Sequence, residues 1–194
     1  SSGQLVSRMT MDGTVTTVVD RYNGKPLNSP NDIWIHPDGS IYFTDPRYRC
    51  PDGPQPQPSN NVFRMAPDGS ELTSVNAHIP KPNGIMGTKD GKTLYVSDTE
   101  SQQIFAFDIE DDGSLSNARV FAKRVSDGMT LDEHGNLYLT DWGGVSILNT
   151  DGKRIEFIPV PEQPANVAFG GADGKTLYVA AHQGLYSIEM TVTE

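Results

Sequence analysis

The sequence predicts an all-β protein built as a β-propeller, because one segment recurs four times and each copy holds short strands separated by turns. The repeats recur at intervals of about 40 to 50 residues, the spacing of propeller blades made of four antiparallel strands. No window shows sustained helical periodicity, which argues against folds with helices between parallel strands. The copies are SPNDIWIHPDGSIYFTDP from Ser29, PNGIMGTKDGKTLYVSDT from Pro82, SDGMTLDEHGNLYLTDW from Ser126 and PANVAFGGADGKTLYVAAH from Pro164.

Each repeat predicts the same series of elements. A first apolar strand ends at a D-G or H-G turn, and a second strand carrying an aromatic residue follows. A variable connection then leads to a third strand, and PDGS, EDDGS or TDGK turns close it, which is typical of a β-meander. The predicted second strands are residues 40–45, 93–98, 136–141 and 176–181, and the third strands are residues 61–66, 103–109, 145–150 and 185–190.

The first twenty residues continue the pattern. The segment from Leu5 to Asp20 aligns with Val62 to Val75, so it predicts the two outer strands of a preceding blade. We therefore expect about four and a half four-stranded blades within a single domain, residues 1–194. A propeller must close its ring or leave an open edge strand, so this count predicts further blades outside the sequence.

The composition of the chain argues against some classes of binding partner. The 194 residues are 36% hydrophobic and 21% charged, as in one globular unit with a core. A net charge of −10 argues against nucleic acid and anionic membranes as partners. No apolar run approaches the roughly 20 residues of a membrane span, and no signal-peptide pattern is present. We expect a soluble protein, cytoplasmic or periplasmic, in which the single cysteine, Cys50, is a free thiol.

The meander predicts which residues share a face. If every first strand starts at one face of the disc, then Asn31, Asn83 and Asp127 surround the mouth of one central channel, with Ala165 at the fourth position. Oxygens from separate elements are what a hard cation such as Ca²⁺ requires. Asn and Asp are also common turn residues, and that interpretation stays open. Five other aspartates, by contrast, lie in the predicted turns of the opposite face, where an aspartate before glycine is explained by backbone preference: Asp38, Asp90, Asp112, Asp151 and Asp173.

Several other motifs do not meet their chemical requirements. The series that begins at Asp108 imitates an EF-hand loop, but its twelfth position is Arg119 instead of glutamate. His182 falls on the channel-mouth face, where we expect a structural role. The proline-rich connection from Pro46 to Asn60 also lies on that face, as a lid or as a neutral insertion. It carries Arg47, Tyr48 and Arg49, which are able to hold a polyhydroxylated or acidic substrate.

Taken together, these motifs resemble the gluconolactonase and regucalcin (senescence marker protein) family, and LNSPND is most similar to its bacterial gluconolactonase-type members. The resemblance implies a six-bladed propeller with a divalent cation in its channel and hydrolysis of sugar lactones. It further implies that this chain lacks an N-terminal blade and a half. The motifs that carry it are GKPLNSPNDIWIHPDGSIYFTDP from Gly24, KPNGI from Lys81, SDGM from Ser126 and NVAFGG from Asn166.

The resemblance also implies roles for individual residues. Asn83 and Asp127 match metal ligands, and Asn31 matches a residue that contacts substrate or cation. A further glutamate ligand, from an E-G-P motif, has no counterpart here and is expected in preceding sequence. Ser29 stands where regucalcin-like members place a substrate-gripping arginine; we therefore assign Ser29, Asn31 and Arg47 to substrate.

The resulting hypothesis is Ca²⁺-dependent hydrolysis of a small-molecule aldonolactone to the aldonic acid, with Zn²⁺ and Mg²⁺ as alternative cations. Asp127 is the catalytic candidate, either as a ligand or as the group that orients or deprotonates water. Two alternatives stay open. The same propeller could hydrolyse phosphoesters or fluorophosphates, or it could be a non-catalytic binding propeller.

Overall fold

A computed structural model describes residues 4–48, 55–75 and 77–194. All regular elements in these ranges are β-strands, which confirms the all-β prediction. The expected behaviour of Cys50 and of Arg49 falls outside the described residues. Within them, no helix is long and apolar enough to cross a membrane.

The strands form antiparallel sheets in chain order. A hairpin of β1 (Val6–Met9) and β2 (Val15–Val19) is followed by a short ribbon, three sheets of four strands and a last sheet of three. The remaining bounds are β3 (Arg21–Tyr22), β4 (Lys25–Pro26), β5 (Ile33–Ile35), β6 (Ile41–Asp45), β7 (Asn61–Met65), β8 (Thr73–Ser74), β9 (Pro82–Gly87), β10 (Thr93–Asp98), β11 (Gln103–Ile109), β12 (Leu115–Ala122), β13 (Met129–Leu131), β14 (Leu137–Asp141), β15 (Gly144–Leu148), β16 (Arg154–Pro159), β17 (Pro164–Gly170), β18 (Thr176–Ala181) and β19 (Gly184–Glu189).

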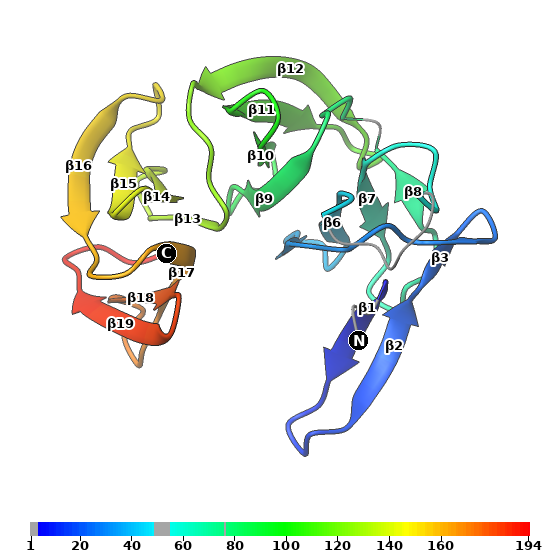
Figure 1. The fold of residues 1–194 in the computed structure, drawn as a ribbon, viewed down its shortest axis with the longest axis horizontal. Helices are drawn as coiled ribbons and strands as arrows, with labels where there is room; N and C mark the ends of the chain where they lie inside the picture. Colours follow the sequence, from blue (N-terminus) through cyan, green and yellow to red (C-terminus); the bar gives the residue numbers. More distant parts are fainter. Residues whose placement is uncertain (1–3, 49–54, 76) are drawn as a thin grey trace.

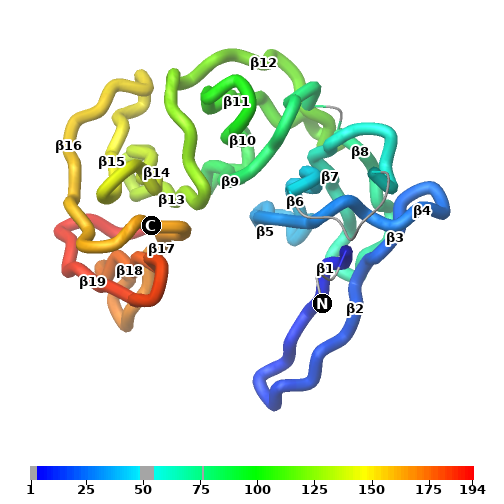
Figure 2. The backbone as a smooth tube through the Cα atoms, viewed as in Figure 1, coloured from blue at the N-terminus to red at the C-terminus, as the bar shows by residue number. Residues whose placement is uncertain are grey.

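The sheets follow one another around an arc, which confirms the predicted propeller arrangement (Figure 1). The first strand of each sheet, β5, β9, β13 or β17, lies on the inner side of the arc, as Figure 2 shows. Neighbouring inner strands contact each other directly. The chain ends beside β17, where Glu194 lies close to Val167 and Ala168.

The hydrophobic core is divided among the spaces between adjacent sheets. Trp34 and Tyr42 of one sheet pack with Ile85 and Leu94 of the next, and the pattern repeats at each following boundary. On the other side, Phe43 and Phe63 pack against the valines of the β1–β2 hairpin. Each sheet therefore buries both of its faces only when it has a neighbour on each side.

Two glycines allow the inner strands to approach closely. A Cβ added at Gly84 would lie 2.4 Å from the carbonyl oxygen of Asp127, in the next sheet. A Cβ at Gly128 would lie 2.3 Å from Oδ1 of Asn166, one sheet further. The glycines that follow Asn83 and Asp127 are therefore required by packing around the axis.

In the three four-stranded sheets, a carboxylate at the end of the second strand holds the segment that leads into the same sheet. Asp45 accepts the N–H groups of Asn28 (2.9 Å) and Ser29 (2.8 Å), and Asp98 accepts that of Lys81 (2.9 Å). Asp141 binds the guanidinium of Arg124 at 2.7 Å. The last sheet has Ala181 at this position. These contacts set where the inner strands of the first three sheets begin.

We expect the substitution Gly84→Ala to lower the free energy of unfolding by roughly 1–3 kcal/mol, because the new methyl group meets a backbone oxygen that cannot move aside. Gly170→Ala, at the end of β17, is the matched control. There the nearest atom is a Tyr178 ring carbon at 3.2 Å, and that side chain can shift. Urea titration of both variants gives the comparison. Equal losses would contradict the packing role of Gly84.

Burial raises the pKa of the Asp45 carboxyl from 3.8 to about 6, although the N–H groups of Asn28 and Ser29 oppose the rise. Folding therefore favours the protonated form of the Asp45 carboxyl relative to the unfolded chain. The stability that this group contributes is complete below pH 3.8 and is lost as the pH rises through 6. Two pKa units correspond to on the order of 3 kcal/mol. We expect the stability difference between wild type and Asp45→Asn to shift by that order against wild type between pH 4 and pH 7. An unchanged difference would contradict this assignment.

Candidate functional site

A cavity of ≈ 710 Å³ opens where the inner strands begin. It brings together Asn83, Asp127 and Ala165, which are three of the four equivalent repeat positions, with His182 and Trp142 at its edge. A second cavity, of ≈ 910 Å³, is lined by the turns that contain Pro37, Asp90 and His134. The turns therefore gather away from the site residues, as the meander predicts.

Asn83 is the most unusual polar residue of the site. Its side chain is 7% exposed, and its Oδ1 atom has no hydrogen-bond partner in the described structure. Its backbone carbonyl, by contrast, accepts a hydrogen bond from the Thr44 hydroxyl at 2.8 Å. An unsatisfied buried oxygen costs about 1–3 kcal/mol, so its presence calls for a functional explanation.

Asp127 presents an exposed side chain to the same cavity. Its backbone N–H donates to Oγ1 of Thr140 at 3.1 Å, which fixes the start of β13. Its charge also acts on the sheet of β5 to β8, two sheets away. Burial is the largest cause that raises the pKa of the Asp32 carboxyl, and the Asp127 charge adds to that rise. The same charge acts on the Tyr48 hydroxyl, whose pKa is raised chiefly by burial.

The two predicted substrate residues before β5 lie one sheet away. Asn31 is exposed, and its backbone N–H donates to the carbonyl of Thr44 at 2.9 Å. Ser29 is half-buried and is held through its N–H by Asp45. The lead-in segment of this sheet is thus fixed by backbone contacts, while the Asn31 side chain lies exposed to solvent.

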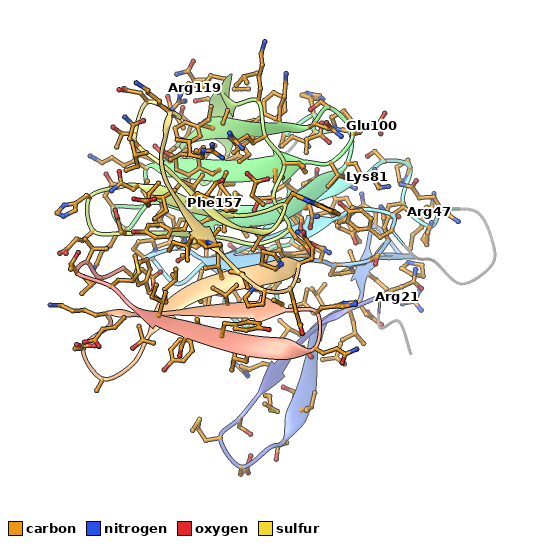
Figure 3. The ribbon with its side chains drawn as sticks, turned by 60° about the vertical axis from the view of Figure 1, so that its left-hand side comes forward. Arg21, Arg47, Lys81, Glu100, Arg119 and Phe157 are labelled. Carbon is orange, nitrogen blue, oxygen red and sulfur yellow. The ribbon has the colours of Figure 1, made fainter. Side chains whose placement is uncertain are left out.

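The connection after β6 supplies side chains beside the channel mouth. The Tyr48 hydroxyl lies 2.9 Å from Oγ1 of Thr99, and the Lys81 ammonium lies 4.8 Å from the centre of the Tyr48 ring. The backbone N–H of Arg47 donates to Oδ1 of Asn60 at 2.8 Å. Figure 3 shows Arg47 and Lys81 along the same edge of the molecule. Two cationic side chains and a phenol therefore border this end of the propeller.

The described residues contain no cluster of three or more histidine, cysteine, aspartate and glutamate side chains that could hold a metal ion. A cation at the mouth would need amide oxygens in addition to a carboxylate. Asn83 Oδ1 meets that need, because it is buried, lacks a partner and shares a cavity with Asp127. The donors present fit a hard cation such as Ca²⁺ and do not fit a soft metal that prefers sulfur.

Sequence reasoning missed the residues that support this site, chiefly Thr44 and the glycines after Asn83 and Asp127. A signal was present: the second strands end in FTD, VSD and LTD in the first three repeats but in VAA in the fourth. That difference coincides with the loss of the site oxygen at Ala165.

The comparisons with known proteins agree with this geometry. The family model described as SMP-30/Gluconolactonase/LRE-like region matches residues 2–183. The chain is 33% identical over 191 residues to a gluconolactonase of Zymomonas mobilis and 30% identical over 188 residues to a pentonolactonase of Haloferax volcanii. Each alignment covers 89% of this chain but only 53% and 62% of those relatives, so the chain spans somewhat more than half of their length.

Among solved structures, a gluconolactonase from Xanthomonas campestris superposes with a TM-score of 0.89 at 34% identity, over 97% of this chain and 66% of that one. Both the family match and the superposition extend over the repeats that build the channel mouth. The chain belongs to the SMP-30/gluconolactonase/LRE-like family.

Proposed function

We propose that this protein hydrolyses a sugar lactone, of the aldonolactone class, at the channel mouth with the help of Ca²⁺. The observation that carries the proposal is the unpartnered, buried Oδ1 of Asn83 in the same cavity as the exposed carboxylate of Asp127. The names of the similar proteins, gluconolactonase and pentonolactonase, support the reaction class.

In this proposal Asn83, Asp127 and Asn31 hold the cation. When bound, a divalent cation supplies Lewis acidity toward the lactone carbonyl oxygen. The two asparagines contribute neutral oxygens, which keeps the net charge of the ligand set low. A low ligand charge preserves the electrophilic strength of a bound cation.

The chain's own residues complete the chemistry. The Asp127 carboxylate accepts a proton from the attacking water or orients that water toward the carbonyl carbon. Attack forms a new C–O bond, and collapse of the tetrahedral adduct breaks the ring C–O bond. The proton taken from the water passes to the departing ring oxygen, which becomes a hydroxyl, and the new carboxylic acid releases its own proton to solvent as the aldonate. Thr140 holds the Asp127 backbone during these steps through the 3.1 Å hydrogen bond.

The substrate hydroxyls are assigned to the residues around the mouth. Ser29 and Asn31 approach from the first complete sheet, and Arg47 comes from the connection after β6. Arginine and asparagine both donate hydrogen bonds to hydroxyl oxygens, so these residues suit a polyhydroxylated ring. The serine at position 29 is small, which leaves room that an arginine would fill.

We expect Asp127→Ala in the full-length protein to lower the kcat/KM for glucono-1,5-lactone by at least about 10²-fold, the usual effect of losing a proton-transfer group. Asp151→Ala, in an exposed turn between β15 and β16, serves as the control and should retain wild-type activity. A pH-stat assay follows acid release directly. Equal activities in the two variants would remove Asp127 from the mechanism. Faster turnover of a fluorophosphate than of any lactone would change the substrate class.

Asn83→Leu separates a metal ligand from a structural asparagine. Leucine has a similar volume and removes an unsatisfied buried oxygen, so we expect the metal-free protein to keep or raise its melting temperature. Calorimetric titration should show that Ca²⁺ binding is lost. If the variant is destabilised by more than about 2 kcal/mol and still binds Ca²⁺ as wild type does, Asn83 is structural.

A further inference from the structure

We propose that Thr44 and Asp32 are positioning residues that clamp the cation-binding oxygens of two adjacent sheets, those of Asn31 and Asn83, into one unit. This inference rests on the proposed function of the channel mouth. It assigns a role in the reaction to two side chains that contact neither the substrate nor the cation.

Thr44 lies at the centre of the clamp. It is fully buried in β6, and its hydroxyl donates to the carbonyl of Asn83 at 2.8 Å while accepting the N–H of Asp32 at 3.1 Å. Its own backbone N–H donates to the carbonyl of Asp32 at 3.0 Å, and its carbonyl accepts the N–H of Asn31 at 2.9 Å. One residue thus holds the Asn31–Asp32 segment with its backbone and the next sheet with its side chain.

Asp32 makes the second connection between the same two sheets. Its Oδ2 accepts the N–H of Ile85 at 3.0 Å, two residues beyond Asn83. Its Oδ1 accepts the N–H of Ile33 at 2.9 Å, which orients the carboxylate from its own strand. The backbone beside Asn83 is therefore held at two points. The Asn83 carbonyl accepts a hydrogen bond from Thr44, and the Ile85 N–H donates one to Asp32.

The other sheets show that this chemistry accompanies the site oxygens. The position of Thr44 is occupied by Ser97 and Thr140. The Ser97 hydroxyl accepts the N–H of Ser126, in the segment that leads into the next sheet, at 2.9 Å. The Thr140 hydroxyl accepts the N–H of Asp127, in the segment that leads into its own sheet, at 3.1 Å. The last sheet has Ala180 there, and its lead-in residue is Ala165. Thr44 and Ser97 each bond to the sheet that follows, and that sheet carries a site oxygen, of Asn83 or of Asp127. Among the described residues, the hydrogen bonds of the Thr140 hydroxyl stay within its own sheet, and the sheet that follows it has Ala165 in place of a site oxygen.

The clamp is useful because Asn83 Oδ1 has no hydrogen-bond partner among the described residues that would fix its orientation. An unsatisfied Asn83 Oδ1 would tend to rotate toward any available donor, so its orientation needs support from neighbouring contacts. Partners of this kind, one shell removed from a metal, change its affinity by about 10–100-fold when they are lost.

The test compares Thr44→Val, which keeps the shape but removes the hydroxyl, with Thr44→Ser, which keeps the hydroxyl. Tyr138→Phe is the matched control, because it deletes another buried hydroxyl, one that donates to Asp132 at 3.2 Å beside the opposite face. Two quantities are measured in each variant: the amide exchange rates of Asp32 and Ile85 by NMR, and the Ca²⁺ dissociation constant by calorimetry.

In Thr44→Val we expect exchange at Asp32 and Ile85 to accelerate at least about tenfold and Ca²⁺ affinity to fall about 10–100-fold. Thr44→Ser should restore both, and Tyr138→Phe should change neither even if its melting temperature falls. Unchanged exchange at Ile85, or a Ca²⁺ affinity that falls equally in Thr44→Val and Tyr138→Phe, would overturn the clamp.

The two proposals fail separately. If wild type binds no Ca²⁺, the proposed function fails, and the exchange rates alone decide whether the clamp exists. If Thr44→Val does not fold, Asp32→Asn takes its place, with the buried far-turn residue Asp132 changed to Asn as its control. Loss of Ca²⁺ affinity specific to Asp32→Asn would support the clamp, and equal affinities in the two variants would contradict it.

Discussion

The site depends on how closely the inner strands approach one another around the axis. The backbone of β9 lies against the backbone of Asp127, so close that only a glycine fits at position 84. A residue that precedes such a glycine cannot turn its side chain into the strand contact. Asn83 and Asp127 therefore face the channel mouth, and the crowding that orients them also shields Asn83 from water.

This geometry has an energetic consequence. Burying the Asn83 oxygen without a partner costs free energy, and holding Asp32 within reach of the Asp127 charge adds to that cost. A protein with a net charge of −10 would not gain stability from either feature. Both costs would be offset by a bound cation, which gives the oxygens a partner and reduces the repulsion. The arrangement is thus one in which stability is lowered at the proposed site.

Much of this could be predicted from the sequence. The repeat period, the D-G turns and the alternating strands placed β6, β10, β14 and β18 within a residue of their observed positions, because each signal is local in the chain. The meander alone also predicted that Asn31, Asn83 and Asp127 surround one channel mouth, and one cavity is lined by Asn83 and Asp127 together with the equivalent Ala165. The contacts of Thr44 and Asp32 could not be predicted in this way, because they join residues that only the packing of adjacent sheets brings together. The last sheet has three strands, whereas four strands were predicted for every repeat.

The most direct measurement is a crystal structure of the full-length protein grown with Ca²⁺ and, in parallel, with Tb³⁺ as an anomalous scatterer. We expect a strong anomalous peak at the channel mouth, at about 2.3–2.6 Å from Asn83 Oδ1 and from an oxygen of Asp127. A protein N–H or hydroxyl donating to Asn83 Oδ1, with no ion beside Asp127, would contradict the assignment of this mouth as a cation-dependent active site.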